Sequence, residues 1–152
     1  MGRREVRRFK KVLHIRTVER EITQGELAVR LQEESEILGR ISDIENRRDS
    51  ALADFCAGRD EAVSPQQFWL ERQNIDVMER DLSDGRQELD LCRGRIEDTK
   101  AELLARHQNV QLMEKYVGRL KERADMEMIS EEQKALDDVT SMRYLKNMRR
   151  EA

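Results

Sequence analysis

The sequence is poor in the residues that build thick cores and that break helices. Only 4% of the 152 residues are aromatic, and the chain has one proline, seven glycines and two cysteines. Charged residues make up 40% of the chain, which leaves too little apolar matter for a thick globular core. Arg, Glu and Leu predominate, a composition typical of long helices that share a narrow seam.

Long apolar runs are also missing. No stretch approaches the ~18 to 20 apolar residues of a membrane span, and the start MGRREVRRFKKVL lacks the apolar stretch of a secretory signal. We therefore expect a cytoplasmic protein without membrane insertion. Cys56 and Cys92 would lie far apart in the hairpin described below, so we expect reduced thiols and no disulfide.

Motifs of enzyme and metal chemistry are absent as well. The sequence has no Gly-x-x-x-x-Gly-Lys loop, Cys-x-x-Cys pair, His-Glu-x-x-His or Gly-x-Ser-x-Gly. His14 and His107 stand alone, without ligands at useful spacing. We expect no enzyme, no cofactor and no metal. Nucleic-acid binding is also disfavoured, because the middle of the chain is acidic and no aromatic platform accompanies the N-terminal arginines.

A heptad seam dominates the second half of the chain. Disorder is the competing interpretation of so polar a sequence, but a disordered chain has no need of a regular apolar period. A period of 3.5 residues sustained over this length predicts a helix that supercoils around a partner helix. The seam positions, of which thirteen in eighteen are apolar, are Phe68, Glu71, Ile75, Met78, Leu82, Gly85, Leu89, Cys92, Ile96, Thr99, Leu103, Arg106, Val110, Met113, Val117, Leu120, Ala124 and Glu127.

The first half shows a weaker version of this pattern, which predicts a helix with one phase shift near residues 25 to 29. Its apolar positions are Phe9, Val12, Leu13, Ile15, Val18, Ile22, Leu27, Leu31, Leu38, Ile41, Leu52 and Phe55.

The break between the halves lies at residues 58 to 64. Ser64 suits an N-cap, Pro65 suits the first helical position, and Gln67 completes a capping box. Val63 and Phe68 are placed for a hydrophobic staple, and Gly58 is a plausible stop for the preceding helix. A short turn predicts that the two helices fold back on each other in antiparallel orientation.

We thus expect a single all-α coiled-coil hairpin over residues 1–152, with helix 1 at about 6–57 and helix 2 at about 65–147. At 1.5 Å per residue the helices would be ~75 Å and ~120 Å long, so helix 2 overhangs. Phe9 would lie roughly opposite Glu114, which leaves the segment after about Tyr116 without an intramolecular partner. Apolar residues continue there, and such an exposed stripe indicates partner binding or self-association. They are Val117, Leu120, Ala124, Met126, Met128 and Ile129.

The charges are unevenly distributed. Residues 1–20 hold eight basic and two acidic residues, residues 143–152 hold four basic and one acidic residue, and the remainder carries a net charge of −12. Basic ends on an acidic body suggest an acidic partner surface at one end, although many such runs are only solvated faces.

Three segments, in their order and spacing, resemble the central-stalk proteins of bacterial type III secretion, the flagellar FliJ and injectisome YscO families. Lys11-Val-Leu-His-Ile-Arg16 resembles the basic-apolar helix start of these families, and Ser64-Pro-Gln-Gln-Phe-Trp-Leu70 resembles the opening of their second helix. Glu114-Lys-Tyr-Val-Gly-Arg119, Arg123 and Glu131-Glu-Gln-Lys-Ala-Leu-Asp137 resemble their charged C-terminal stretch. The very basic start departs from the flagellar pattern and favours the injectisome branch.

The resemblance implies a stalk that joins a hexameric secretion ATPase to the export gate in the membrane, and that also handles export chaperones. It implies peripheral association with the secretion apparatus. ATPase binding would fall to basic residues of the chain ends, namely Arg7, Arg8, Lys11, Arg16, Arg119, Arg123 and Lys134. Gate binding would fall to apolar residues near the turn, namely Phe55, Trp69, Leu70 and Val77.

The seam points Phe68 inward and turns Trp69, Leu70 and Val77 toward solvent, which suits a binding patch. The alternative is that Trp69 folds over the turn onto Val63 or Ala62. Two other functions also suit a helical hairpin: a self-associating structural coiled coil, and a chaperone-like hairpin that holds unfolded clients.

Overall fold

The chain forms two long helices, α1 (Gly2–Ala57) and α2 (Pro65–Glu151), that pack against each other in an all-α fold. The computed structural model describes residues 2–57 and 64–151. The predicted turn, with Gly58 and Val63, falls mostly outside these residues. None of the described helices is long and apolar enough to cross a membrane.

The contacts within the chain divide it into two units. The hairpin unit comprises residues 22–104. The terminal unit comprises residues 1–21 and 105–152. Each unit contains a part of α1 and a part of α2, and each is described separately below.

The start of α2 has the predicted cap. The hydroxyl oxygen of Ser64 accepts a hydrogen bond from the Gln67 amide at 3.2 Å, and the Ser64 carbonyl accepts one from the Phe68 amide at 3.1 Å. The first bond satisfies an amide that has no backbone partner in the first turn of a helix, and the second is the first backbone bond of α2. With Pro65 at the first helical position, local chemistry alone fixes where α2 begins.

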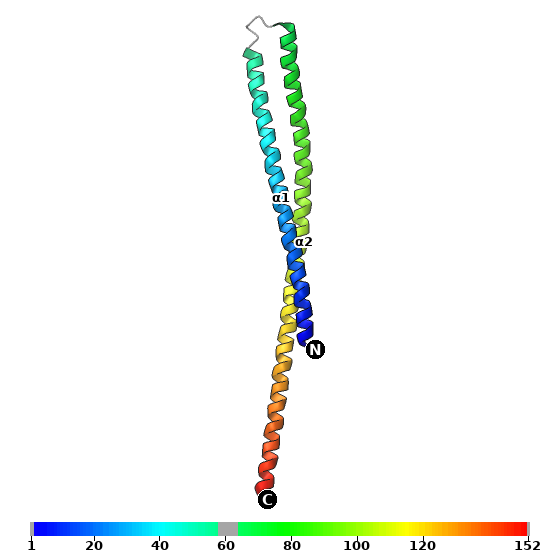
Figure 1. The fold of residues 1–152 in the computed structure, drawn as a ribbon, viewed down its shortest axis with the longest axis vertical. Helices are drawn as coiled ribbons and strands as arrows, with labels where there is room; N and C mark the ends of the chain where they lie inside the picture. Colours follow the sequence, from blue (N-terminus) through cyan, green and yellow to red (C-terminus); the bar gives the residue numbers. More distant parts are fainter. Residues whose placement is uncertain (1, 58–63, 152) are drawn as a thin grey trace. The chain divides into compact units, whose positions relative to one another are not determined.

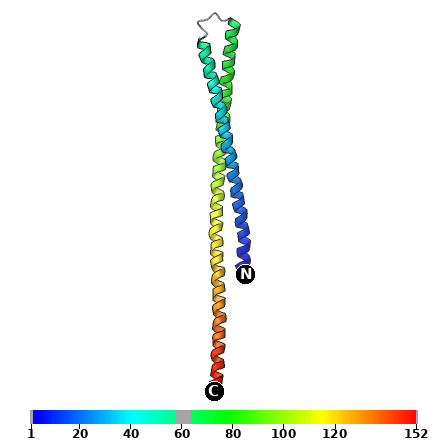
Figure 2. The ribbon, with the colours of Figure 1, turned by 60° about the vertical axis from the view of Figure 1, so that its left-hand side comes forward.

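In the hairpin unit α1 and α2 lie side by side in both views (Figures 1 and 2). Their shared core is a narrow row of apolar side chains from both helices, and those from α2 occupy predicted seam positions. The core residues are Ile37, Ile41, Leu82, Leu89, Cys92 and Ile96, with Leu27 and Ile44 packed beside them. Cys92 is thus a buried seam residue, and both cysteines are free thiols.

Gly85 lets the helices approach closely in this core. A Cβ atom placed on Gly85 would lie 3.1 Å from Cγ1 of Ile41, closer than ordinary van der Waals contact, whereas a Cβ on Gly94 would meet no atom within 4 Å. Gly85 is therefore a packing residue, and Gly94 is not.

Ion pairs between the helices line both edges of the hairpin seam. Arg40 contacts Glu88 at 3.0 Å and Arg93 contacts Glu34 at 3.3 Å. Two further pairs join Arg86 to Glu45 and Arg48 to Glu79. Such pairs add little stability where they are exposed, but they discriminate against other registers, which would bring like charges together.

The predicted phase shift in α1 is wrong. The inward side of α1 keeps steps of three and four across residues 25 to 29, with Thr23 buried and Leu27 and Arg30 half-buried. Several residues on the inward side of α1 are polar. A pattern based on the apolar residues alone therefore predicted a phase shift that the helix does not have. Six residues of α1 that we assigned to the seam are exposed, namely Ile15, Val18, Ile22, Leu31, Leu38 and Leu52.

In the terminal unit the start of α1 lies along α2, and α2 continues beyond it (Figures 1 and 2). The Phe9 ring meets the Tyr116 ring edge-on at 4.9 Å between centroids, close to the predicted pairing with Glu114. The Oε2 atom of Glu19 accepts a hydrogen bond from Arg106 at 3.1 Å. Thr17 and Phe9 are half-buried on the same side of α1.

The expectation that α2 loses its partner after about Tyr116 is wrong. Val117 and Leu120 are 4% and 8% exposed, and a Cβ on Gly2 would touch Cβ of Ala124 at 3.2 Å. The reason is that α1 begins at Gly2 and not near residue 6, and that Phe9 pairs two residues further along α2 than expected. The segment in which α2 buries no side chain, here called the tail, is therefore residues 125–151, all of which are exposed, although Met128 still contacts Arg3 of α1.

Candidate protein-binding surfaces

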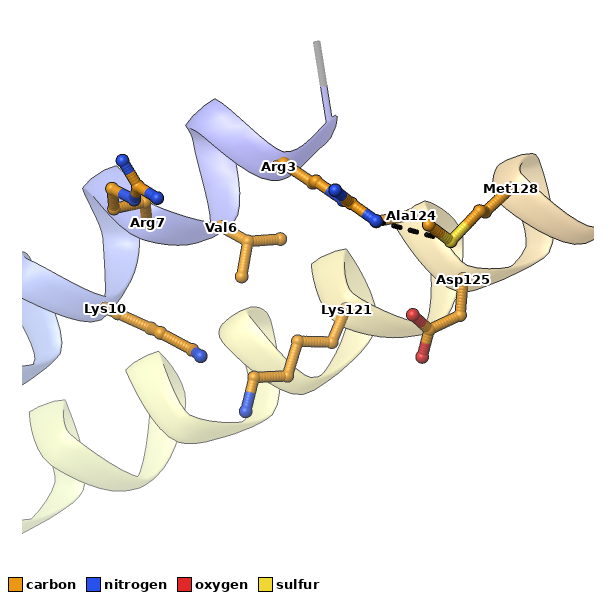
Figure 3. Close-up of a pocket in the computed structure, with 8 residues that line it drawn as sticks. All are labelled: Arg3, Val6, Arg7, Lys10, Lys121, Ala124, Asp125 and Met128. Carbon is orange, nitrogen blue, oxygen red and sulfur yellow. Dashed lines mark hydrogen bonds between the residues drawn. The ribbon is translucent and has the colours of Figure 1, made fainter.

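A basic cleft of about 360 Å³ lies where the first turns of α1 meet α2 in the terminal unit (Figure 3). Val6 and Lys10 point from α1 toward α2, whereas the Lys121 side chain runs along α2 (Figure 3). The residues that line the basic cleft are Arg3, Val6, Arg7, Lys10, Lys121, Ala124, Asp125 and Met128.

The cleft carries an excess of positive charge. Four of its side chains are cations and one is a carboxylate. Among the described residues none of the four cations forms an ion pair, and Arg3 donates only a weak hydrogen bond to the Met128 sulfur at 3.5 Å. Val6, Ala124 and Met128 supply an apolar floor. Uncompensated cations beside apolar surface suit an acidic segment of a partner protein that also carries an apolar side chain.

The predicted ATPase-binding residues are all exposed and all belong to the terminal unit. Arg7 lines the basic cleft, while Arg8 and Lys11 lie on α1 beside it. Arg16 lies further along α1 and contacts Glu19 at 3.3 Å, so its charge is partly compensated. Arg119 and Arg123 lie one helical turn apart on α2, and Lys134 lies in the tail.

Sequence reasoning missed three cations of the cleft, Arg3, Lys10 and Lys121. Arg3, Arg7 and Lys10 follow steps of four and three along α1, so they share one side of that helix. This spacing was visible in the sequence. The α2 residues opposite them depended on where α1 begins, which the sequence pattern placed four residues too late.

A second candidate surface is apolar and lies in the hairpin unit. Trp69 and Leu70 are 58% and 59% exposed, and Val77 is exposed on α2 as well. Phe55 is half-buried, and its ring stacks on that of Phe68 with centroids 4.7 Å apart. Phe68 therefore faces α1 as expected, although it keeps two fifths of its surface exposed. Val63 and Ala62, the alternative contacts of Trp69, lie outside the described residues.

The histidine, cysteine and carboxylate side chains of the described residues gather into no metal-holding group. In the terminal unit the Nδ1 atom of His107 lies 3.3 Å from the Nη1 atom of the Arg20 guanidinium. Both candidate surfaces are open faces of the helix pair, so protein binding suits them better than catalysis does.

Comparison with known proteins identifies the family. The family model described as "Flagellar FliJ protein" matches residues 5–149, which is nearly the whole chain and includes both candidate surfaces except Arg3. No curated protein and no solved structure matches the chain. The match to a flagellar model gives no support to our preference for the injectisome branch. The chain belongs to the flagellar FliJ protein family, a family of structural components of flagellar and type III protein export.

Proposed function

We propose that this chain is the central stalk of a type III protein export apparatus, joining a hexameric secretion ATPase to the membrane export gate. The observation that carries the proposal is the family match over residues 5–149. The structure adds support of a different kind, since it presents two surfaces of different chemistry in two separate units of one helix pair. A cytoplasmic location at the membrane apparatus, and contact with export chaperones, belong to the same proposal.

In this proposal the terminal unit binds the ATPase through its exposed cations. Arg7, Arg8 and Lys11 form no ion pair among the described residues, so their charge is available to an acidic partner. Contacts between exposed charges are individually weak and exchange fast. Such contacts suit a stalk that must not lock the ring that holds it, and they weaken as salt screens them.

Charge reversal tests the ATPase contact. Arg7→Glu with Arg8→Glu should weaken ATPase binding about tenfold or more at physiological salt, because each reversal turns an attraction into a repulsion. Wild-type binding should itself weaken as salt rises. Binding is measured by sedimentation or fluorescence anisotropy with the purified ATPase.

Arg47→Glu with Arg72→Glu is the matched control for that pair. It changes the charge by the same amount at exposed positions of the hairpin unit and should leave ATPase binding within about threefold of wild type. Undiminished ATPase binding by the Arg7→Glu, Arg8→Glu variant would remove the electrostatic contact from the proposal.

In the same proposal the hairpin unit binds the export gate through Trp69, Leu70 and Val77. Trp is enriched at energetic hot spots because it buries a large area at low entropic cost. The capped start of α2 holds Trp69 and Leu70 on a rigid helix. Phe55 supports the surface from α1 by stacking on Phe68.

Trp69→Ala tests this second contact. We expect export in cells to fall strongly while helicity, thermal stability and ATPase binding stay unchanged, because more than half of the indole is exposed in the free protein. A fall in thermal stability instead would make Trp69 a packing residue of the hairpin. Val29→Ala, another exposed apolar residue of the hairpin unit, is the control and should leave export intact.

A further inference from the structure

The tail, residues 125–151 of α2, has an amphipathic pattern that α1 does not cover beyond the contact of Arg3 with Met128. At 100° per residue, positions with alternating steps of three and four share one face of a helix. One such face, here called the tail stripe, consists of Ile129, Glu132, Leu136, Val139, Arg143 and Lys146. All six residues are exposed.

The residues around the tail stripe set it apart from the rest of the tail. Met128, Ala135 and Met142 run along one edge of it and widen its apolar surface. The opposite face is entirely polar between residues 130 and 141, and its residues are Ser130, Glu131, Lys134, Asp137, Asp138 and Ser141. Up to residue 142 the tail therefore has a face suited to another helix and a face suited to water. Beyond residue 142 the second face also carries exposed apolar side chains, namely Tyr144, Leu145 and Met148.

The tail is also charged in two halves of opposite sign. Residues 125–138 contain six acidic residues and one basic residue, and residues 139–151 contain four basic residues and one acidic residue. Among the described residues, Glu132, Arg143 and Lys146 form no ion pair. An antiparallel pair of such helices brings each acidic half against a basic half, whereas a parallel pair brings like charges together.

We infer that the tail is a self-recognition surface, which binds the tail of a second copy of this chain in antiparallel orientation. The stripe fixes the register. Leu136 lies opposite Val139 of the second copy, and Glu132 then lies opposite Arg143 of the second copy. Because the pairing is twofold, each of these contacts occurs twice.

The inference goes beyond the proposed function and does not depend on it. Lys134, the proposed ATPase contact in the tail, lies on the polar face and stays accessible in the pair. When the chain is not bound to another protein, self-pairing covers the apolar residues of the tail stripe. Self-pairing is measured on the purified full-length chain alone. A failure of ATPase or gate binding therefore does not contradict self-pairing, and a failure of self-pairing does not contradict ATPase or gate binding.

The test is sedimentation equilibrium of the full-length chain up to a concentration on the order of 100 µM at physiological salt. The wild type should show a monomer–dimer equilibrium. Glu132→Arg and Arg143→Glu should each raise the dissociation constant about tenfold or more, because each places like charges opposite one another at two sites. The double variant Glu132→Arg, Arg143→Glu restores the complementary pair and should return to within about threefold of wild type.

Glu131→Arg is the matched control, since it makes the same charge change one residue away on the polar face. It should leave the dissociation constant within about threefold of wild type, and circular dichroism should show equal helicity for all variants. A chain that stays monomeric over the whole range overturns the inference. So does a double variant no better than the single ones, or a Glu131→Arg effect as large as that of Glu132→Arg.

Discussion

The hairpin unit and the tail both contain a part of α2, but α2 is packed against α1 in the hairpin unit and exposed in the tail. Between residues 75 and 104 α2 buries six of its nine seam residues and half-buries the other three, and α1 covers that seam along its length. In the tail the same helix buries none. Isolated helices of ordinary composition are marginal in water, and packing of an apolar face supplies most helical stability. Stability should therefore be concentrated in the hairpin unit and low in the tail.

The largest expected effect is a contrast between two leucines of α2. Leu89 lies in the hairpin core at 8% exposure, and Leu136 lies in the tail at 66%. Leu89→Ala should lower the free energy of unfolding by about 2 to 4 kcal/mol, because it removes buried methyl groups and leaves a cavity. Leu136→Ala deletes the same atoms and should change the free energy of unfolding by less than about 0.5 kcal/mol in dilute protein.

Chemical denaturation followed by circular dichroism measures both values, at a protein concentration low enough to keep the chain monomeric. The contrast fails if the two substitutions cost the same. That result would mean that α2 is stabilised by something other than its contact with α1.

Much of this contrast could be predicted from the sequence. The seam of α2 from Ile75 to Ala124 was predicted position by position, because apolar residues there recur at an unbroken period. The start of α2 was predicted as well, since Ser64, Pro65 and Gln67 act locally and need no tertiary contact.

Other features depended on contacts between segments distant in the sequence. The seam of α1 includes Thr23 and Arg30, and a polar residue at a seam position cannot be recognised by hydrophobicity. Predicting the basic cleft required knowing the residue at which α1 begins. Helix starts without a capping residue are the least predictable boundaries. The length of the unpaired tail was overestimated for the same reason.

A smaller effect is expected from two glycines of α2, and it tests how tightly the hairpin unit packs. Gly94→Ala should stabilise the protein by about 0.5 to 1 kcal/mol, since alanine favours the helix and its Cβ would meet no atom within 4 Å. Gly85→Ala gains the same propensity but pushes a methyl group against Ile41, with 3.1 Å from Cβ to Cγ1. Overpacking costs about 1 to 3 kcal/mol, so we expect net destabilisation of about 1 kcal/mol.

Thermal and chemical unfolding of the two glycine variants gives the sign of each change directly. If Gly85→Ala stabilised the protein as much as Gly94→Ala, the helices would have room to separate at Ile41. The hairpin core would then be looser than the structure shows.

The smallest effect concerns the ion pair between Arg40 and Glu88, whose 3.0 Å separation makes it the shortest of those that join the helices of the hairpin unit. Both side chains are more than half exposed, so water and salt compete with the pair, and holding two long side chains in one geometry costs entropy. Glu88→Ala should therefore change the free energy of unfolding by no more than about 0.5 kcal/mol, although Glu88 adjoins Leu89 in the chain.

A double-mutant cycle with Arg40→Ala isolates the interaction of the pair and should return a coupling energy of about 0.2 to 1 kcal/mol that shrinks in high salt. A coupling of several kcal/mol, insensitive to salt, would contradict this assignment, because it would mean that the edge charges hold the hairpin together and that the apolar seam does not.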